Sequence, residues 1–207
     1  MLRKIHILAA PTGAGKSTLT ENPSRYLTSS PDIPLYREFL RVNESLPAMR
    51  AMGQDNYMNL SESRDEVFIH VDFWNAFSGR PIDLNEAYPY FNKEAFNNWK
   101  SLQYLYQIES VHIYTMFVSR PILFDRWIGR EIASGYNKVN AKVANIYGNT
   151  IDRNRPFWCL YGAWFDFVND LKPEINVVVE ADNTPYRLVD FADWEQARKL
   201  LVVKSSW

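Results

Sequence analysis

The residues best suited to chemistry lie near the start of the chain, where an apolar run leads into a turn of small residues. The run covers residues 4–9 (KIHILA), and residues 10–17 (APTGAGKS) follow it directly. Small residues let the backbone curl so that successive N–H groups point inward, where they can bind the oxygens of a phosphate. Lys16 adds a compact positive charge, and the hydroxyl of Ser17 can ligate Mg²⁺.

This pattern predicts a P-loop with Ala10 in the place of the usual first glycine. The apolar run fits a strand, and a helix is expected from about Gly15, with its positive dipole end near the phosphates. Pro23 should end or restart that helix after a short run. A turn with a chance Gly-Lys-Ser would not explain the preceding strand. We therefore expect bound ATP to contact seven residues: Thr12, Gly13, Ala14, Gly15, Lys16, Ser17 and Thr18.

The composition limits the classes of protein to which the chain can belong. Its 207 residues suffice for one α/β domain (residues 1–207) rather than two. With 23 Lys and Arg against 24 Asp and Glu, no overall positive charge attracts nucleic acid, although a local basic patch stays possible. A single cysteine, Cys159, fits a reducing cytoplasm, and the three histidines show no zinc-ligand spacing. We see no signal peptide or membrane-spanning run and expect a cytoplasmic protein.

A second apolar run, residues 67–74 (VFIHVDFW), carries a carboxylate near its end at Asp72. Without polar alternation, this run predicts a parallel strand that is buried on both faces. The carboxyl ends of parallel strands share one edge of a sheet, so we expect Asp72 to lie near the P-loop. There it could accept a proton from an attacking hydroxyl. Arg80, in the following loop, is either a phosphate contact or a solvated arginine.

A third stretch, residues 121–127 (PILFDRW), is interpreted as a short strand that ends at Asp125 and is followed by Arg126. Mg²⁺ or an attacking hydroxyl needs a carboxylate at such a strand end beside a P-loop. We therefore expect Asp125, together with Ser17, to bind Mg²⁺. An ordinary ion pair between Asp125 and Arg126 is the alternative. Residues 128–137 are expected to be helical.

The remaining segments are expected to complete a three-layer P-loop NTPase fold, in which helices flank a mostly parallel central sheet. The periodicity predicts helices over residues 35–58 (with a break at Pro47), 93–110, 157–171 and 193–203. It predicts strands over residues 175–181 and 186–191, and it fits either state for residues 112–118. The segment 137–156, with Arg153 and Arg155, is either a flap over the phosphates or a solvated loop.

Three features together resemble thymidylate kinases and the related deoxynucleoside kinases: the P-loop, the Phe-Asp-Arg-Trp block at residues 124–127, and residues 164–184. The resemblance covers about half of the chain. It implies transfer of the γ-phosphoryl of ATP to a pyrimidine nucleotide or nucleoside. Lys16 and Ser17 would then hold the triphosphate and Mg²⁺, and Arg126 would bind the phosphate or steer the hydroxyl of the acceptor. Asp72 stands where polynucleotide kinases place their proton-accepting carboxylate.

The phosphoryl acceptor is open at this point. A phosphate acceptor needs positioning by arginine, whereas an alcohol needs a general base, and Arg126 and Asp72 offer both. A hydroxyl of nucleic acid, such as that of 5-hydroxymethyluracil in phage DNA or a polynucleotide end, is therefore a second candidate. The region 185–190 offers only Arg187, where thymidylate kinases carry an arginine-rich lid.

Other nucleotide-binding classes are further alternatives, namely a nucleotide-hydrolysing switch, a binding module or a sulfotransferase-like enzyme. Residues 137–140 (NKVN) lack the acid of a guanine-reading motif, and no strand ends in the paired acids of an ATPase motor. The intact Lys16-Ser17 pair favours a kinase over a sulfotransferase. We expect no membrane partner, and the sequence leaves the oligomeric state open.

Overall fold

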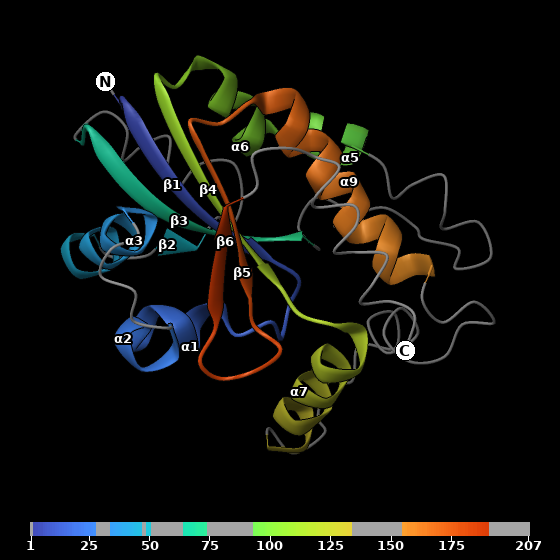
Figure 1. The fold of residues 1–207 in the computed structure, drawn as a ribbon. Coiled ribbons are helices and arrows are strands. Elements are labelled where there is room, and N and C mark those ends of the chain that lie inside the picture. The colour runs from blue at the N-terminus through green and yellow to red at the C-terminus, as the bar shows by residue number, and fades with distance from the viewer. Residues whose placement is uncertain are drawn as a thin grey trace.

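The computed structural model describes residues 2–27, 34–46, 49–50, 64–73, 93–133 and 155–190. The strands in these ranges are β1 (Lys4–Ala10), β2 (Met49–Arg50), β3 (Glu66–Asp72), β4 (Ser110–Phe117), β5 (Ile175–Glu180) and β6 (Arg187–Asp190). They form one sheet in the order β2-β3-β1-β4-β5-β6 (Figure 1). Neighbouring strands from β2 across to β5 are parallel to one another, and the edge strand β6 is antiparallel to β5. The expected mostly parallel α/β sheet is confirmed.

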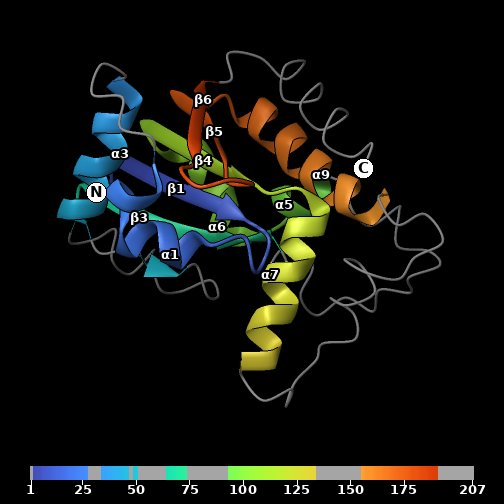
Figure 2. The same ribbon diagram turned by 60° about the horizontal axis from the view of Figure 1, so that its bottom comes forward.

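Helices cover both faces of this sheet (Figures 1 and 2). They are α1 (Lys16–Glu21), α2 (Pro23–Tyr26), α3 (Pro34–Ser45), α5 (Lys93–Asn97), α6 (Lys100–Gln103), α7 (Arg120–Ala133) and α9 (Arg155–Leu171), with the 3₁₀-helix η3 (Tyr104–Gln107). The first three lie on one side, and α5, α6 and α9 lie on the other. Strands β1, β3 and β4 are buried almost throughout, which is typical of parallel strands between two helical layers.

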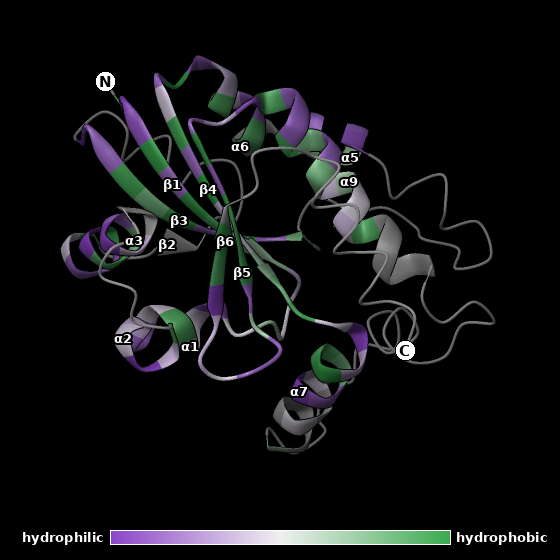
Figure 3. Cartoon of the chain, in the orientation of Figure 1, coloured by the Kyte–Doolittle hydropathy of each residue, from purple (hydrophilic) through white to green (hydrophobic). Residues whose placement is uncertain are grey.

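Aromatic side chains fill both layers of the core. On the α3 face, Phe39 packs edge-to-face on Tyr114, with 5.0 Å between ring centroids. On the α9 face, the ring centroids of Trp164 and Phe73 lie 5.1 Å apart. The indole Nε1 of Trp164 donates a hydrogen bond to Thr115 Oγ1 at 2.9 Å. Figure 3 shows hydrophobic residues along the strands and hydrophilic ones at the outer ends of β1 and β3. Polar side chains therefore lie outside the core where β1 and β3 begin.

Several expected elements are confirmed. Strands β1 and β3 lie where the apolar runs predicted them, and β5 and β6 fall within the expected ranges 175–181 and 186–191. Helix α9 matches the aromatic helix expected over residues 157–171. The break at Pro23 is also found: α1 ends at Glu21 and α2 begins at the proline, whose missing N–H costs nothing in a first turn.

The expected strand over residues 121–127 is wrong, because these residues belong to helix α7. Pro121 lies in its first turn, where proline is tolerated. Leu123 and Trp127, four residues apart, share the buried face. A short apolar run alone does not separate a strand from a buried helix. The strand that pairs with β1 on this side of the sheet is β4 instead. It covers residues 112–118, whose state the sequence left undecided, up to Phe117.

Two further helix predictions need correction. Residues 93–110 do not form one helix, because α5, α6 and η3 follow one another and β4 begins at Ser110. The region 35–58 holds only one described helix, α3, and residues 49–50 form the edge strand β2. The predicted helix over residues 193–203 and most of the segment 137–156 lie outside the described residues, as does Arg80.

Candidate functional site

The loop of residues 10–17 forms the turn between β1 and α1, where the sequence predicts a turn between a strand and a helix. Gly13 and Gly15 have positive φ values of 83° and 98°, a conformation that side-chain-bearing residues rarely adopt. These two positions therefore require glycine. Ala10, which replaces the usual first glycine, is the last residue of β1 and is fully buried with ordinary strand geometry. An alanine fits there because this position does not need a positive φ.

The side chain of Lys16 folds back over this loop. Its Nζ donates hydrogen bonds to the carbonyl oxygens of Ala10, at 2.8 Å, and Pro11, at 3.1 Å. It also lies 3.7 Å from Asp72 Oδ2, and the two side chains are 12% and 24% exposed. The ammonium is thus held at the loop by partners that can exchange for phosphate oxygens.

Asp72 reaches this place through the register of the sheet. It is the last residue of β3 and stands opposite Ala10 of β1. The expected position of Asp72, at the end of its strand and beside the loop of residues 10–17, is confirmed. Thr12 is half-buried, whereas Ser17 and Thr18 are exposed on the first turn of α1. The hydroxyl of Ser17 is therefore accessible to an ion.

Helix α7 packs directly against the loop, and it begins beside the carboxyl end of β1 (Figure 2). A Cβ atom on Gly13 would lie 3.5 Å from Trp127 Cβ and 3.7 Å from Leu123 Cδ1. Arg126 Nη1 donates to the carbonyl oxygen of Ala14 at 3.1 Å, and Nη2 donates to that of Ala181 at 2.6 Å. Arg126 therefore joins the loop to the segment that follows β5.

Asp125 lies elsewhere on α7. Successive residues of an α-helix turn by about 100°, so Asp125 projects from the face opposite to Leu123 and Trp127. Its side chain is exposed. The interpretation of Asp125 as the end of a strand is wrong, because Asp125 lies within helix α7. Its assignment to Mg²⁺ stays a prediction, although the strand end from which it was inferred does not exist. Among the four expected catalytic residues, the structure brings Lys16 and Asp72 together and places Arg126 on the loop backbone.

Tyr186 is a residue of this site that the sequence interpretation missed. Its ring lies 5.8 Å from Arg126 Cζ and stacks on Tyr26 at 5.6 Å. A Cβ on Gly15 would lie 3.5 Å from its hydroxyl oxygen. The only signal in the sequence was that Tyr186 is an aromatic residue at the start of the strand expected over residues 186–191. Such a residue is equally typical of a core position. Arg187, the one arginine in the region where thymidylate kinases carry a lid, donates a hydrogen bond to Glu180 Oε2 at 2.8 Å.

Comparison with known proteins adds no family. Neither a family model nor a curated protein matches this chain. Within the described residues, no helix has both the length and the apolar character needed to cross a bilayer. The function is therefore inferred from the geometry of the loop and its neighbours.

Proposed function

We propose that the chain is a P-loop kinase that binds ATP at residues 12–18 and transfers its γ-phosphoryl group to a hydroxyl of a pyrimidine nucleoside, nucleotide or nucleic acid. The observation that carries this proposal is the pair of Lys16 and Asp72, 3.7 Å apart at the mouth of a glycine-containing loop. The loop offers backbone N–H groups and a cation to the triphosphate. The carboxylate offers a base to the acceptor.

A hydroxyl acceptor fits these side chains better than a phosphate acceptor. A phosphate acceptor is already ionised and needs a cation for positioning, and the candidate for that task, Arg126, donates to two backbone carbonyl oxygens. An alcohol must lose a proton, and Asp72 lies where it could take one. Asp72 would accept this proton as the hydroxyl oxygen bonds to the γ-phosphorus and the bond to the bridging oxygen of ADP breaks.

The other groups of the loop would stabilise the charge on the transferred phosphoryl group. Lys16 would exchange its two carbonyl partners for phosphate oxygens. Bound Mg²⁺ neutralises phosphate charge in such reactions, and the exposed Ser17 hydroxyl would hold it. Arg126 would keep the loop in place rather than touch the acceptor.

The test is to measure ADP release from ATP and Mg²⁺ with a panel of acceptors: thymidine, thymidine monophosphate, hydroxymethyl-deoxyuridine monophosphate, an oligonucleotide and hydroxymethyluracil DNA. We expect release to rise with an acceptor that offers a hydroxyl, and Asp72→Asn to slow that reaction by about 10²-fold or more. Asp65→Asn, at an exposed position outside the loop, is the control.

Other outcomes would point to the alternatives. Phosphorylation of thymidine monophosphate on its phosphate, with little effect of Asp72→Asn, would indicate a thymidylate kinase. ADP release without any acceptor would indicate a nucleotide-hydrolysing switch. The first result would contradict the assignment of Asp72 as general base, and the second would contradict the assignment of a kinase.

A further inference from the structure

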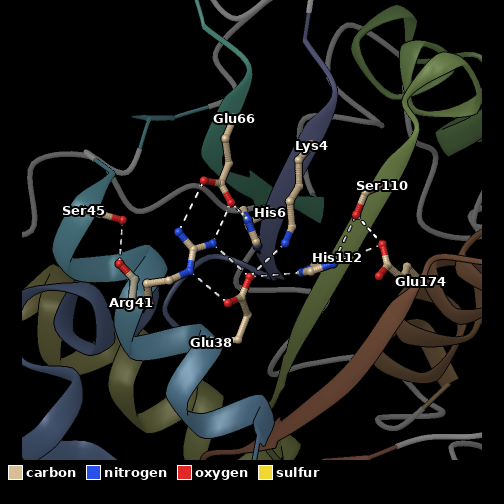
Figure 4. A network of polar contacts seen from close by, with 9 residues as sticks. All are labelled: Lys4, His6, Glu38, Arg41, Ser45, Glu66, Ser110, His112 and Glu174. Atoms are coloured by element: carbon tan, nitrogen blue, oxygen red, sulfur yellow. Dashed lines mark hydrogen bonds and ion pairs between the residues drawn. The ribbon is translucent and has the colours of Figure 1, made fainter.

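A second polar cluster lies at the opposite, amino-terminal end of the parallel strands. Figure 4 shows its members, which come from α3, from the first residues of β1, β3 and β4, and from the residue just before β5: Lys4, His6, Glu38, Arg41, Glu66, Ser110, His112 and Glu174. His6 of β1 stands opposite His112 of β4, and their rings are perpendicular, with centroids 4.7 Å apart. Both histidines are buried: His6 is 0% exposed and His112 is 2% exposed. The proposed kinase reaction uses none of this cluster, which lies about 13 Å along β1 from Ala10.

The hydrogen bonds of His6 leave one ring nitrogen without a partner. Its Nε2 lies 2.7 Å from Glu66 Oε1, and an ionised carboxylate can only accept, so Nε2 carries the proton. Nδ1 then holds a lone pair. It is buried and has no hydrogen-bond partner among the described residues. Burial lowers the pKa of His6 to about 4, so the ring is neutral near pH 7.

His112 has the same arrangement. Its Nε2 lies 3.2 Å from Ser110 Oγ and 3.5 Å from Glu174 Oε2. Ser110 donates its single hydroxyl proton to Glu174, so it can only accept from His112. The proton of His112 is therefore on Nε2 and the lone pair on Nδ1, which is buried and also has no partner in the described part of the chain. Nδ1 lies 3.8 Å from Glu38 Oε1.

We propose that His6, His112 and Glu38 form a binding site for a divalent transition-metal ion, with Zn²⁺ preferred. One ligand atom of each lies within 4.8 Å of those of the other two, so a small contraction would bring all three to an ion. Two imidazoles with one carboxylate are a ligand set of zinc sites with an open fourth position. Glu66 and Glu174 lie next to Nε2 of His6 and of His112, the ring nitrogens that would not bind the ion. Carboxylates commonly orient metal-bound histidines in this way.

Lys4 is the built-in competitor of this ion. Its Nζ lies 3.0 Å from Glu38 Oε1, the same oxygen that the ion would use. The lysine side chain is 31% exposed, so its ammonium can turn to solvent without crossing the core. Once Lys4 has turned to solvent, the cluster holds three carboxylates (Glu38, Glu66 and Glu174) and one cation, Arg41. Its net charge is then −2. A divalent ion would therefore leave the cluster neutral.

The inference is tested by titrating the chelator-treated full chain with Co²⁺, without nucleotide, and following the visible absorption of the bound ion. We expect one equivalent to bind and Zn²⁺ to displace it. Glu38→Gln should weaken binding by more than about 100-fold, and Glu66→Gln by about 10- to 100-fold. Lys4→Met should tighten binding by at least about tenfold, because it removes a competing charge. Glu44→Gln, exposed on the same helix, should change nothing.

Three results would overturn the proposal. The first is no saturable Co²⁺ binding by the folded chain. The second is unchanged binding in a Glu38→Gln variant whose circular dichroism is native. The third is unchanged or weaker binding in Lys4→Met. Lys4 and Glu38 are both partly exposed, so these variants decide the question even if a substitution of buried His6 or His112 prevents folding.

Discussion

At the scale of single residues, Arg126 shows why a side chain's partners must be known before it receives a role. A resemblance placed it on the phosphoryl acceptor, whereas its guanidinium donates to Ala14 and Ala181 and lies over the ring of Tyr186. Arginine suits this position because its planar fork can hold two carbonyl oxygens at once. We interpret Arg126 as a positioning residue for the loop of residues 10–17.

Substitution of Arg126 separates this role from direct contact with the acceptor. Arg126→Met should lower the free energy of unfolding by about 1.5–3 kcal/mol, because two charged hydrogen bonds are lost. It should also weaken ATP binding. Arg126→Lys keeps the charge but not the fork and should recover only part of both losses. Denaturant unfolding and calorimetry measure them. A variant with unchanged stability and only a raised KM for the acceptor would place Arg126 on the substrate.

At the scale of elements, the polar cluster attaches α3 to the sheet. Arg41 donates to Glu38 on its own helix and to Glu66 of β3, at 2.9 Å and 2.6 Å. These hydrogen bonds lower the pKa of Glu38 and of Glu66 to about 2. Burial, in contrast, lowers the pKa of His6 to about 4 and also lowers that of His112. All four groups bind protons less readily in the folded chain than in the unfolded chain.

These shifts predict that the metal-free protein loses stability on acidification. The unfolded chain takes up histidine protons below about pH 6.5, so the free energy of unfolding should fall between pH 6.5 and 4. The carboxylates should add a second fall from about pH 4.5 towards 2. Denaturant unfolding over this range is the measurement. Glu38→Gln should flatten the lower window and Glu44→Gln should not; a curve independent of pH would contradict the network.

Elements also show what the sequence could predict. The loop at residues 10–17 specified its own strand, turn and helix, because only a few residue types tolerate the backbone of Gly13 and Gly15. Residues 121–127 did not specify their state, since a run of seven apolar and polar residues fits a strand or a helix until its packing is known. The error carried Asp125 into the predicted site.

At the scale of the whole molecule, the sheet order decides which distant residues meet. The order β3-β1-β4 places Asp72 beside Lys16 at one end of β1 and Glu66, His6 and His112 together at the other. Asp72 was predictable because strand ends share an edge. The proposed metal site was not predictable, since His6, Glu38 and His112 come from β1, α3 and β4 and lie too far apart in the sequence to form a metal-binding motif. Pairing between strands, rather than local pattern, creates that site.

The central claim is that Lys16 and its loop bind the triphosphate, and calorimetric titration with ATP and Mg²⁺ tests it most directly. The account predicts that the wild-type chain binds ATP and that Lys16→Ala loses both binding and phosphoryl transfer while its circular dichroism and unfolding stay near those of the wild type. Lys93→Ala, which removes a surface lysine paired with Asp170 at 2.6 Å, should bind ATP normally. Near-normal ATP binding and transfer by Lys16→Ala would contradict the account.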